Sequence, residues 1–130
     1  MRKEKNVHKA ICEYLKYQYP KIYFMSDPSG LKMSIGMATD LKRTRSKHKQ
    51  LDIVVLEPSG NYHGLVLEVK KDRSEVYRKD GTFKKSVHVD EQNESIEHLR
   101  EKGYKVEYAF GFEHGVSIID TYLALNINVK

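Results

Sequence analysis

The sequence predicts a single α/β domain with a mixed central β-sheet flanked by helices. Short apolar segments rich in β-branched residues alternate along the chain with segments whose apolar residues recur at helical spacing. The length of 130 residues is enough for one domain with its own hydrophobic core. A hydrophobic content of 39% and a charged content of 32% are typical of a soluble globular domain.

The first half of the chain predicts a helix, a strand, a turn and a second helix. In this order, the elements cover residues 3–18, 22–25, 26–30 and 31–45. The first helix has its apolar residues on one stripe and ends before Pro20. The second helix is a weaker prediction, because Gly36 and Thr39 have low helix propensity.

The second half predicts two strands joined by a turn, then a long polar segment, a helix, a strand and a last helix. In this order, the elements cover residues 51–56, 57–61, 65–70, 71–90, 92–102, 106–110 and 113–125. Within the polar segment, Asp80-Gly81 between aromatic residues predicts a small hairpin over residues 77–83. Gly103 follows the predicted helix at the position where a glycine commonly ends one.

The net charge is +5 and the pI is about 9.2, and the charges are segregated along the chain. The first basic group is Lys42, Arg43, Arg45, Lys47 and Lys49. The second is Lys70, Lys71, Arg73, Arg78, Lys79, Lys84 and Lys85. The acids concentrate later, at Asp90, Glu91, Glu94, Glu97 and Glu101. This segregation is expected if one face contacts phosphate, and the alternative is a set of solvated loops.

The cysteine and histidine content favours a cytoplasmic protein without a zinc site. Cys12 is the one cysteine, so an internal disulfide is excluded and a reducing compartment is expected. The six histidines form no HxxxH or His/Cys cluster. No segment approaches the roughly 18 uninterrupted apolar residues of a membrane helix, so no membrane association is expected.

Two carboxylates lie on the central pair of predicted strands. If these strands form a hairpin centred on Gly60, the numbers of opposed residues sum to 120, and Asp52 lies across from Glu68. Directly opposed like charges repel, and a divalent cation between them would remove the repulsion. Carboxylate oxygens suit Mg²⁺ or Mn²⁺. The register is an assumption from the turn, and a slip by one residue would turn Asp52 to the other face.

The residue types around this pair fit phosphodiester hydrolysis. Such a reaction needs a cation that activates water and neutralises the charge developing on phosphorus. The Val69 carbonyl is a further candidate ligand, and Lys70 shares a face with Glu68, where it would orient water or stabilise the transition state. That face is expected to open onto something polar. The alternatives are that the carboxylates pair with nearby basic residues and that Lys70 is an ordinary strand lysine.

The pattern of Asp52 followed by Glu68-Val69-Lys70 resembles the PD-(D/E)xK (restriction-endonuclease-like) nuclease core. More of the chain resembles one branch, the virus-type replication-repair nuclease (VRR-NUC) domains, in the small stand-alone phage form. The resemblance covers nearly the whole sequence and implies one VRR-NUC-like nuclease domain over residues 1–130. The segments that carry it are 26–30, 51–53, 57–58, 62–70, 77–82, 91–92, 99–104 and 119–123.

The resemblance implies further site residues. An acidic residue of the first helix reaches the metal in that family, and Glu4 fits the family spacing, with Glu13 as a competitor. Gln92 matches a family glutamine that would orient a metal-bound water, and its alternative role is that of an amide at a helix terminus. One departure is that Lys49-Gln50-Leu51 precedes Asp52, where the family usually has proline.

The resemblance also implies the activity: an Mg²⁺- or Mn²⁺-dependent endodeoxyribonuclease, a homodimer, that nicks branched DNA and especially four-way (Holliday) junctions. Two sites related by a two-fold axis suit paired cuts. A phage-encoded protein would act in the host cytoplasm. The alternatives are a sequence-selective nuclease of the same core and a non-catalytic nucleic-acid-binding module on this fold.

The basic segments would then position DNA through its phosphates. The candidate contacts are Lys42, Arg43, Arg45, Lys47, Lys49, Lys71, Arg73, Arg78 and Lys79. Tyr77 and Phe83 would either stack on bases or pack across a dimer interface, and packing is the favoured expectation because aromatic residues that flank a hairpin more often pack.

Overall fold

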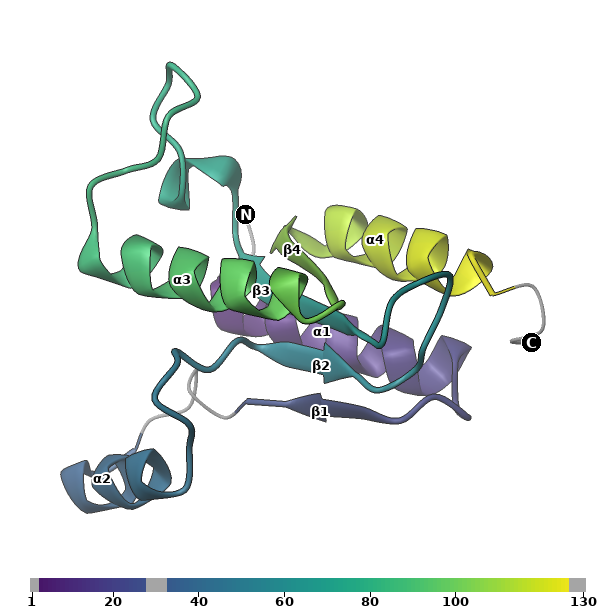
Figure 1. Ribbon diagram of the computed structural model, residues 1–130, viewed down its shortest axis with the longest axis horizontal. Helices are drawn as coiled ribbons and strands as arrows, with labels where there is room; N and C mark the ends of the chain where they lie inside the picture. The colour runs from purple at the N-terminus through teal and green to yellow at the C-terminus, as the bar shows by residue number, and fades with distance from the viewer. Residues whose placement is uncertain (1–2, 28–32, 127–130) are drawn as a thin grey trace.

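A four-stranded mixed sheet forms the centre of the molecule (Figure 1). The computed structural model describes residues 3–27 and 33–126. The strands are β1 (Phe24–Ser26), β2 (Ile53–Val55), β3 (Leu65–Lys70) and β4 (Lys105–Phe110), in the spatial order β1-β2-β3-β4. The first two pairings are antiparallel and β3 pairs with β4 in parallel. The predicted fold class, a mixed sheet in an α/β domain, is confirmed.

Helices cover both faces of this sheet. The helices are α1 (Glu4–Gln18), α2 (Ile35–Arg43), α3 (Val87–Glu101) and α4 (Phe112–Ala124), with a short 3₁₀ turn, η2 (Arg73–Glu75). The larger core cluster joins α1 and α4 to one face, and a smaller cluster joins α3 to the other. Among the residues that the structure describes, no helix has the length and apolar character to cross a membrane.

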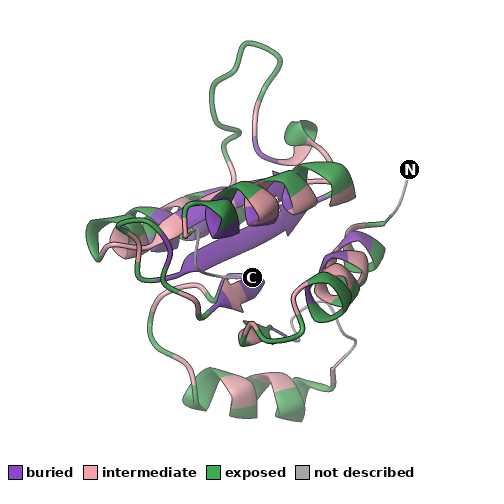
Figure 2. Ribbon diagram, turned by 90° about the vertical axis from the view of Figure 1, so that its right-hand side faces the viewer, coloured by how far each residue is buried: buried purple, intermediate pink, exposed green. Residues whose placement is uncertain are grey.

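The β3 strand is buried along its whole length (Figure 2). Leu65, Leu67 and Val69 enter the larger core under α1 and α4, because alternate side chains of a strand share a face. Val66 faces the smaller core under α3. Residues of β2 and β3 pair with numbers that sum to 120, so the register assumed from the Gly60 turn is confirmed.

Several element boundaries differ from the sequence-based expectation, among them the strand predicted over 51–56, which covers 53–55. The first strand covers residues 24–26 rather than 22–25, because only three residues pair with the equally short β2. The helix predicted over 92–102 begins five residues earlier, where the Ser86 hydroxyl accepts from the Val89 N–H. The helix predicted over 31–45 covers 35–43. The predicted turn at 26–30 lies partly outside the described residues, at positions 28–30.

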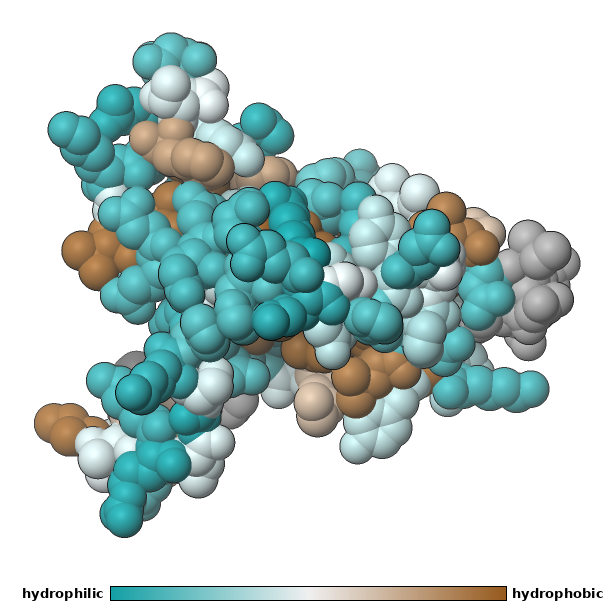
Figure 3. Space-filling view, viewed as in Figure 1, coloured by the Kyte–Doolittle hydropathy of each residue, from teal (hydrophilic) through white to brown (hydrophobic). Residues whose placement is uncertain are grey.

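Two segments project from the end of the sheet at which β2 begins and β3 ends (Figure 1). One is α2, which has no buried residue. The other is the loop that carries the predicted hairpin, where Tyr77 and Phe83 form an isolated β-bridge. Side chains on both projections are largely hydrophilic (Figure 3). The fold therefore presents two polar arms on either side of one end of the sheet.

The buried strand generates a stability prediction. Leu67 has no exposed surface, so Leu67→Ala should lower the free energy of unfolding by about 3 kcal/mol through lost burial and a cavity. Leu56→Ala, at a leucine that is 44% exposed, is the matched control and should cost much less. Urea denaturation followed by circular dichroism measures both, and equal losses would contradict the described packing of β3.

Candidate metal centre

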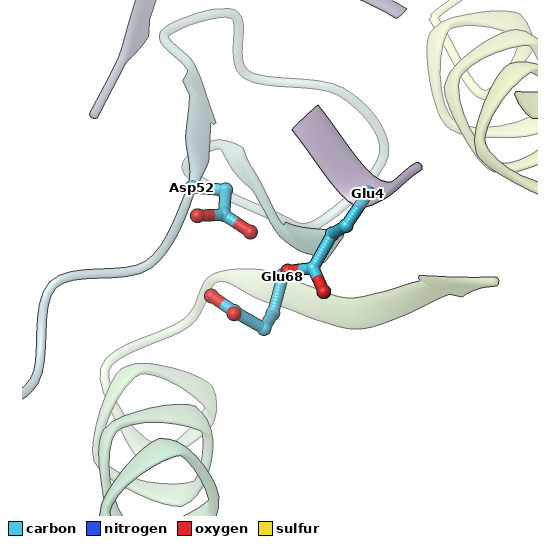
Figure 4. A group of neighbouring side chains, drawn as sticks. All are labelled: Glu4, Asp52 and Glu68. Atoms are coloured by element: carbon cyan, nitrogen blue, oxygen red, sulfur yellow. The ribbon is translucent and has the colours of Figure 1, made fainter. Parts of the chain in front are cut away.

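Three carboxylates from separate elements converge at the end of the sheet (Figure 4). Glu4 comes from the first turn of α1, Asp52 directly precedes β2, and Glu68 lies in β3. Each offers one oxygen, and these three atoms all lie within 4.8 Å of one another. The group could therefore hold one metal ion.

The β2–β3 hairpin places Asp52. Extended by one residue, the observed register sets Asp52 opposite Glu68. The Val69 N–H donates a hydrogen bond of 2.7 Å to Asp52 Oδ2, and the Asp52 carbonyl accepts one of 2.7 Å from the Asp27 N–H. Asp52 is thus held by main-chain bonds from both neighbouring segments, and its carboxylate is turned toward β3.

Two side chains, one from α3 and one from β3, contact the same oxygen of the Glu68 carboxylate. Gln92 Nε2 donates to Glu68 Oε2 over 2.9 Å, and Lys70 Nζ lies 3.6 Å from the same oxygen. Glu68, Lys70 and Gln92 are all buried. The sequence-based expectation that this face of β3 opens onto something polar is borne out at Glu68, which lines a polar pocket. At Val66 the same face is covered by α3 and its apolar residues instead.

Two buried oxygens at this site have no hydrogen-bond partner among the described residues: Glu68 Oε1 and Gln92 Oε1. A buried acceptor without a donor is costly, so each needs a ligand that donates or carries positive charge. Carboxylate and amide oxygens are the ligand atoms that Mg²⁺ and Mn²⁺ prefer. The residues present therefore fit a divalent cation.

Burial raises the pKa values of all three carboxyls, and repulsion from neighbouring carboxylates raises those of Glu4 and Glu68 further. The pKa of Glu68 rises to about 9, first because the group is buried and second because of the charge on Asp52. The pKa of Glu4 rises to about 7, through burial and then the neighbouring Glu75. Burial also raises the pKa of Asp52. The three groups cannot all ionise cheaply unless a cation compensates them.

A polar pocket of about 350 Å³ contains the cluster. It is lined by Glu4, Lys5, His8, Lys49, Gln50, Asp52, Glu68 and Gln92. Glu13, the competitor of Glu4, is exposed and lines a different hollow with Tyr14 and Tyr17. Gln92 lies in the second turn of α3 rather than at a helix terminus, so the alternative role as a terminal amide is excluded.

Sequence reasoning missed two neighbours of the cluster. His8 lies one helical turn after Glu4 and contacts Ser26 Oγ at 2.6 Å through Nε2, and the helical period could have found it. Glu75 approaches Glu4 closely enough to raise its pKa. The position of Glu75 depends on the η2 turn, and no residue pattern in the sequence predicts this turn.

The predicted DNA contacts divide between the two projections. Lys42 and Arg43 end α2 and are exposed, whereas Arg45 forms an ion pair of 2.6 Å with Asp27. Lys47 is exposed and Lys49 lines the polar pocket. The remaining candidate contacts lie before, on and after η2 and are all exposed: Lys71, Arg73, Arg78 and Lys79.

Comparison with known proteins identifies the fold. No protein-family model and no curated protein matches the chain. A solved structure described as a "VRR_NUC domain protein" is similar to it, with a TM-score of 0.71 and 27% sequence identity. The similarity covers 97% of this chain and 92% of that one. The chain has the VRR-NUC fold. The predicted resemblance and the PD-(D/E)xK core that it implied are thereby confirmed.

The raised pKa values give this VRR-NUC fold a pH-dependent stability. In EDTA the folded protein binds more protons than the unfolded chain between the ordinary glutamate pKa of 4.5 and the Glu68 pKa of about 9, so stability should fall as the pH rises across this window. Thermal unfolding of the protein and of Glu68→Gln at several pH values measures the effect as the difference between the two curves.

Adding Mg²⁺ should raise the melting temperature most at the alkaline end of the window, where the carboxylates are ionised and free to bind it. Glu68→Gln should show a flatter pH dependence and a smaller response to Mg²⁺. Curves that run parallel for the two proteins would contradict the described environment of Glu68.

Proposed function

We propose that the protein is an Mg²⁺- or Mn²⁺-dependent endodeoxyribonuclease that hydrolyses phosphodiester bonds. One observation carries the proposal: Glu4, Asp52 and Glu68 converge at the end of the sheet in a VRR-NUC fold, with Glu68 Oε1 buried and lacking a donor. A purely structural role for the cluster would leave Glu68 Oε1 buried without a partner among the described residues.

The chain's own side chains have distinct roles in this proposal. Glu4, Asp52 and Glu68 would hold the cation, and the Val69 carbonyl is the further candidate ligand. When bound, the cation supplies Lewis-acid activation of water and neutralisation of the phosphate charge. Gln92 fixes the Glu68 carboxylate through its amide N–H, and its own orphaned oxygen is available to accept from a water molecule.

Lys70 contributes a positively charged side chain to the site, in addition to the metal ion. Its ammonium group is buried 3.6 Å from Glu68, in surroundings of low dielectric where a charge acts strongly on its neighbours. We assign it the stabilisation of the negative charge that develops on the phosphate during attack. The same position also allows it to orient the attacking water.

The two polar projections would position DNA over the centre. Exposed cations on α2 and on the segment after β3 lie on either side of the acid cluster, where they can contact phosphates without reading bases (Figure 1). Arg45 would act indirectly, because its ion pair with Asp27 anchors the segment after α2 to the sheet.

The finer proposal is that the substrate is branched DNA, especially a four-way junction, nicked by a homodimer. It rests on the resemblance to stand-alone VRR-NUC nucleases and on symmetry, because paired cuts need two centres related by a two-fold axis. Two arms that flank a single active site suit a substrate whose strands leave that site in different directions.

The metal ligands can be tested against a control on the same helix. Glu4→Gln should lower the rate of DNA cleavage at fixed Mg²⁺ by more than about 100-fold, the upper end of the effect of losing an outer-shell partner. Glu13→Gln, at an exposed glutamate of α1, should leave the rate unchanged. Asp52→Asn and Glu68→Gln should abolish cleavage and spare DNA binding. Full activity in any of the three site variants would contradict the assignment.

Substrate choice is tested with end-labelled DNA. A four-way junction, a flap, a nicked duplex and a plain duplex are compared in Mg²⁺, in Mn²⁺ and in EDTA. We expect metal-dependent, symmetric cuts in the junction, a spared duplex and a solution mass twice the 15.2 kDa of the chain. Tight metal-independent binding without cleavage of any substrate would contradict the proposal and favour the binding-module alternative.

The exposed cations of α2, one of the two polar arms, generate a prediction about how DNA affinity depends on salt concentration. Replacing Lys42 and Arg43 by glutamine should weaken binding of all DNA sequences and lower the slope of log affinity against log salt by about two. The control is the pair Lys21→Gln and Lys102→Gln, because both lysines are exposed and follow the far ends of α1 and α3. An unchanged slope in the α2 variant would remove this arm from the DNA contact.

A further inference from the structure

A second pocket, of about 310 Å³, lies on the other side of α3 from the metal centre. Five of its eleven lining residues are aromatic, and we call it the aromatic pocket. Its aromatic residues are Tyr77, Phe83, Tyr108, Phe110 and His114. Its volume is at the lower end of the range of small-molecule sites. Among its lining residues Ile96 is the one aliphatic side chain, and the others that are not aromatic are charged or polar.

The rings are arranged as stacked plates. Tyr77 and Phe83 stack with centroids 5.2 Å apart and planes inclined by 21°. Phe110 and His114 are inclined by 9° at 5.6 Å, and the Phe110 N–H donates to His114 Nδ1 over 2.9 Å, which fixes the imidazole plane. Arg73 adds a further planar group, with its guanidinium 4.6 Å from the Tyr77 ring centroid.

Part of this stack is open to solvent. Phe83 is 49% exposed at the mouth of the pocket, and His114 is exposed. An exposed phenylalanine continuing a stack offers a planar ligand one free aromatic face, and the Arg73 guanidinium favours the same shape of ligand. An aliphatic ligand would gain less from these surfaces, because stacking requires a second flat partner.

The aromatic pocket and the metal centre lie on the same face of the sheet, on opposite sides of α3. In the parallel pairing of β3 with β4, Glu68 is the partner of Tyr108 and Lys70 the partner of Phe110. Partners in a sheet point to the same face, so the catalytic pair and the aromatic pair lie one strand spacing apart, about 4.8 Å. On α3, Gln92 lines the metal centre and the next residue, Asn93, lines the aromatic pocket.

The described residues of the pocket carry no excess of positive charge that would select a phosphate, because Glu97 and Glu107 balance Arg73 and Arg100. Glu97 and Glu107 line one wall, and each forms an ion pair with Arg100, at 3.1 and 3.8 Å. Carboxylates repel a phosphate and accept from the amino groups of bases. The DNA phosphates would contact the cations on the segment after β3, where Lys71, Arg78 and Lys79 are exposed.

We propose that the aromatic pocket binds the base of an unpaired nucleotide of the same DNA whose phosphate is held at the metal centre. The proposal rests on the proposed nuclease function and specifies its substrate: DNA with unpaired bases at the site of cleavage. A base within a duplex is stacked on both faces and cannot enter, whereas an unpaired base can stack on aromatic side chains at little cost.

The test measures base stacking directly in EDTA, so that neither metal nor cleavage is involved. The probe is a short single-stranded DNA with one 2-aminopurine, whose fluorescence falls when the base stacks on a ring. The protein should quench the probe. Phe83→Ala should relieve the quenching and weaken binding about tenfold. Phe83→Tyr should restore both, because the ring is retained.

Tyr17→Ala is the matched control, since Tyr17 is an 89% exposed aromatic residue outside the pocket, and it should behave as the unaltered protein. The same probe within a duplex should show no quenching that depends on Phe83. Equal quenching by Phe83→Ala and the unaltered protein would overturn the proposal. So would a Phe83→Ala variant that halves the solution mass and leaves quenching intact, because the pocket would then be covered by a second copy.

The outcome separates this proposal from the nuclease assignment. Quenching that depends on Phe83 in a protein that cuts no DNA would support the base pocket and contradict the nuclease function. Cleavage without such quenching would overturn the base pocket alone.

Discussion

The structure depends on the burial of the Glu68 carboxylate opposite Asp52. Two like charges on adjacent buried positions would destabilise a hairpin, and the approach of Glu4 from α1 adds a third. The protein has local means of reducing this cost: the Val69 N–H bonds Asp52, and the Gln92 amide and the Lys70 ammonium lie on one oxygen of Glu68. One Glu68 oxygen still has no donor among the described residues. A cation at that position would bind this oxygen and compensate the remaining negative charge.

The parallel β3–β4 pair extends this arrangement across the sheet. Each polar residue at the end of β3 has an aromatic partner on β4, so one face carries first the charged centre and then the aromatic pocket. Helix α3 covers both and contributes consecutive residues to the two sites. DNA that reached both sites would present a phosphate to the charged centre on one side of α3 and an unpaired base to the aromatic pocket on the other, which is the physical basis for linking cleavage to unpaired DNA.

Much of the fold and the centre of the site could be predicted from the sequence. The apolar strand segments and the Gly60 turn were enough to predict the pairing of β2 with β3, and with it the position of Asp52 opposite Glu68. The burial of Glu68 and Lys70 could not be predicted, because alternation within a strand does not reveal that α3 covers the second face. The aromatic pocket could not be predicted from the sequence either. Tyr77 and Phe83 were visible as hairpin residues, but Phe110 and His114 join them only through the parallel crossover.

The most direct test of the central claim is a crystal structure of the protein soaked with Mn²⁺, with anomalous diffraction recorded to locate the ion. We expect one strong anomalous peak within ligand distance of Glu4, Asp52 and Glu68, and its loss in Glu68→Gln. A well-ordered structure with these three carboxylates in place, and no peak between them at millimolar Mn²⁺, would contradict the assignment of the cluster as a metal centre.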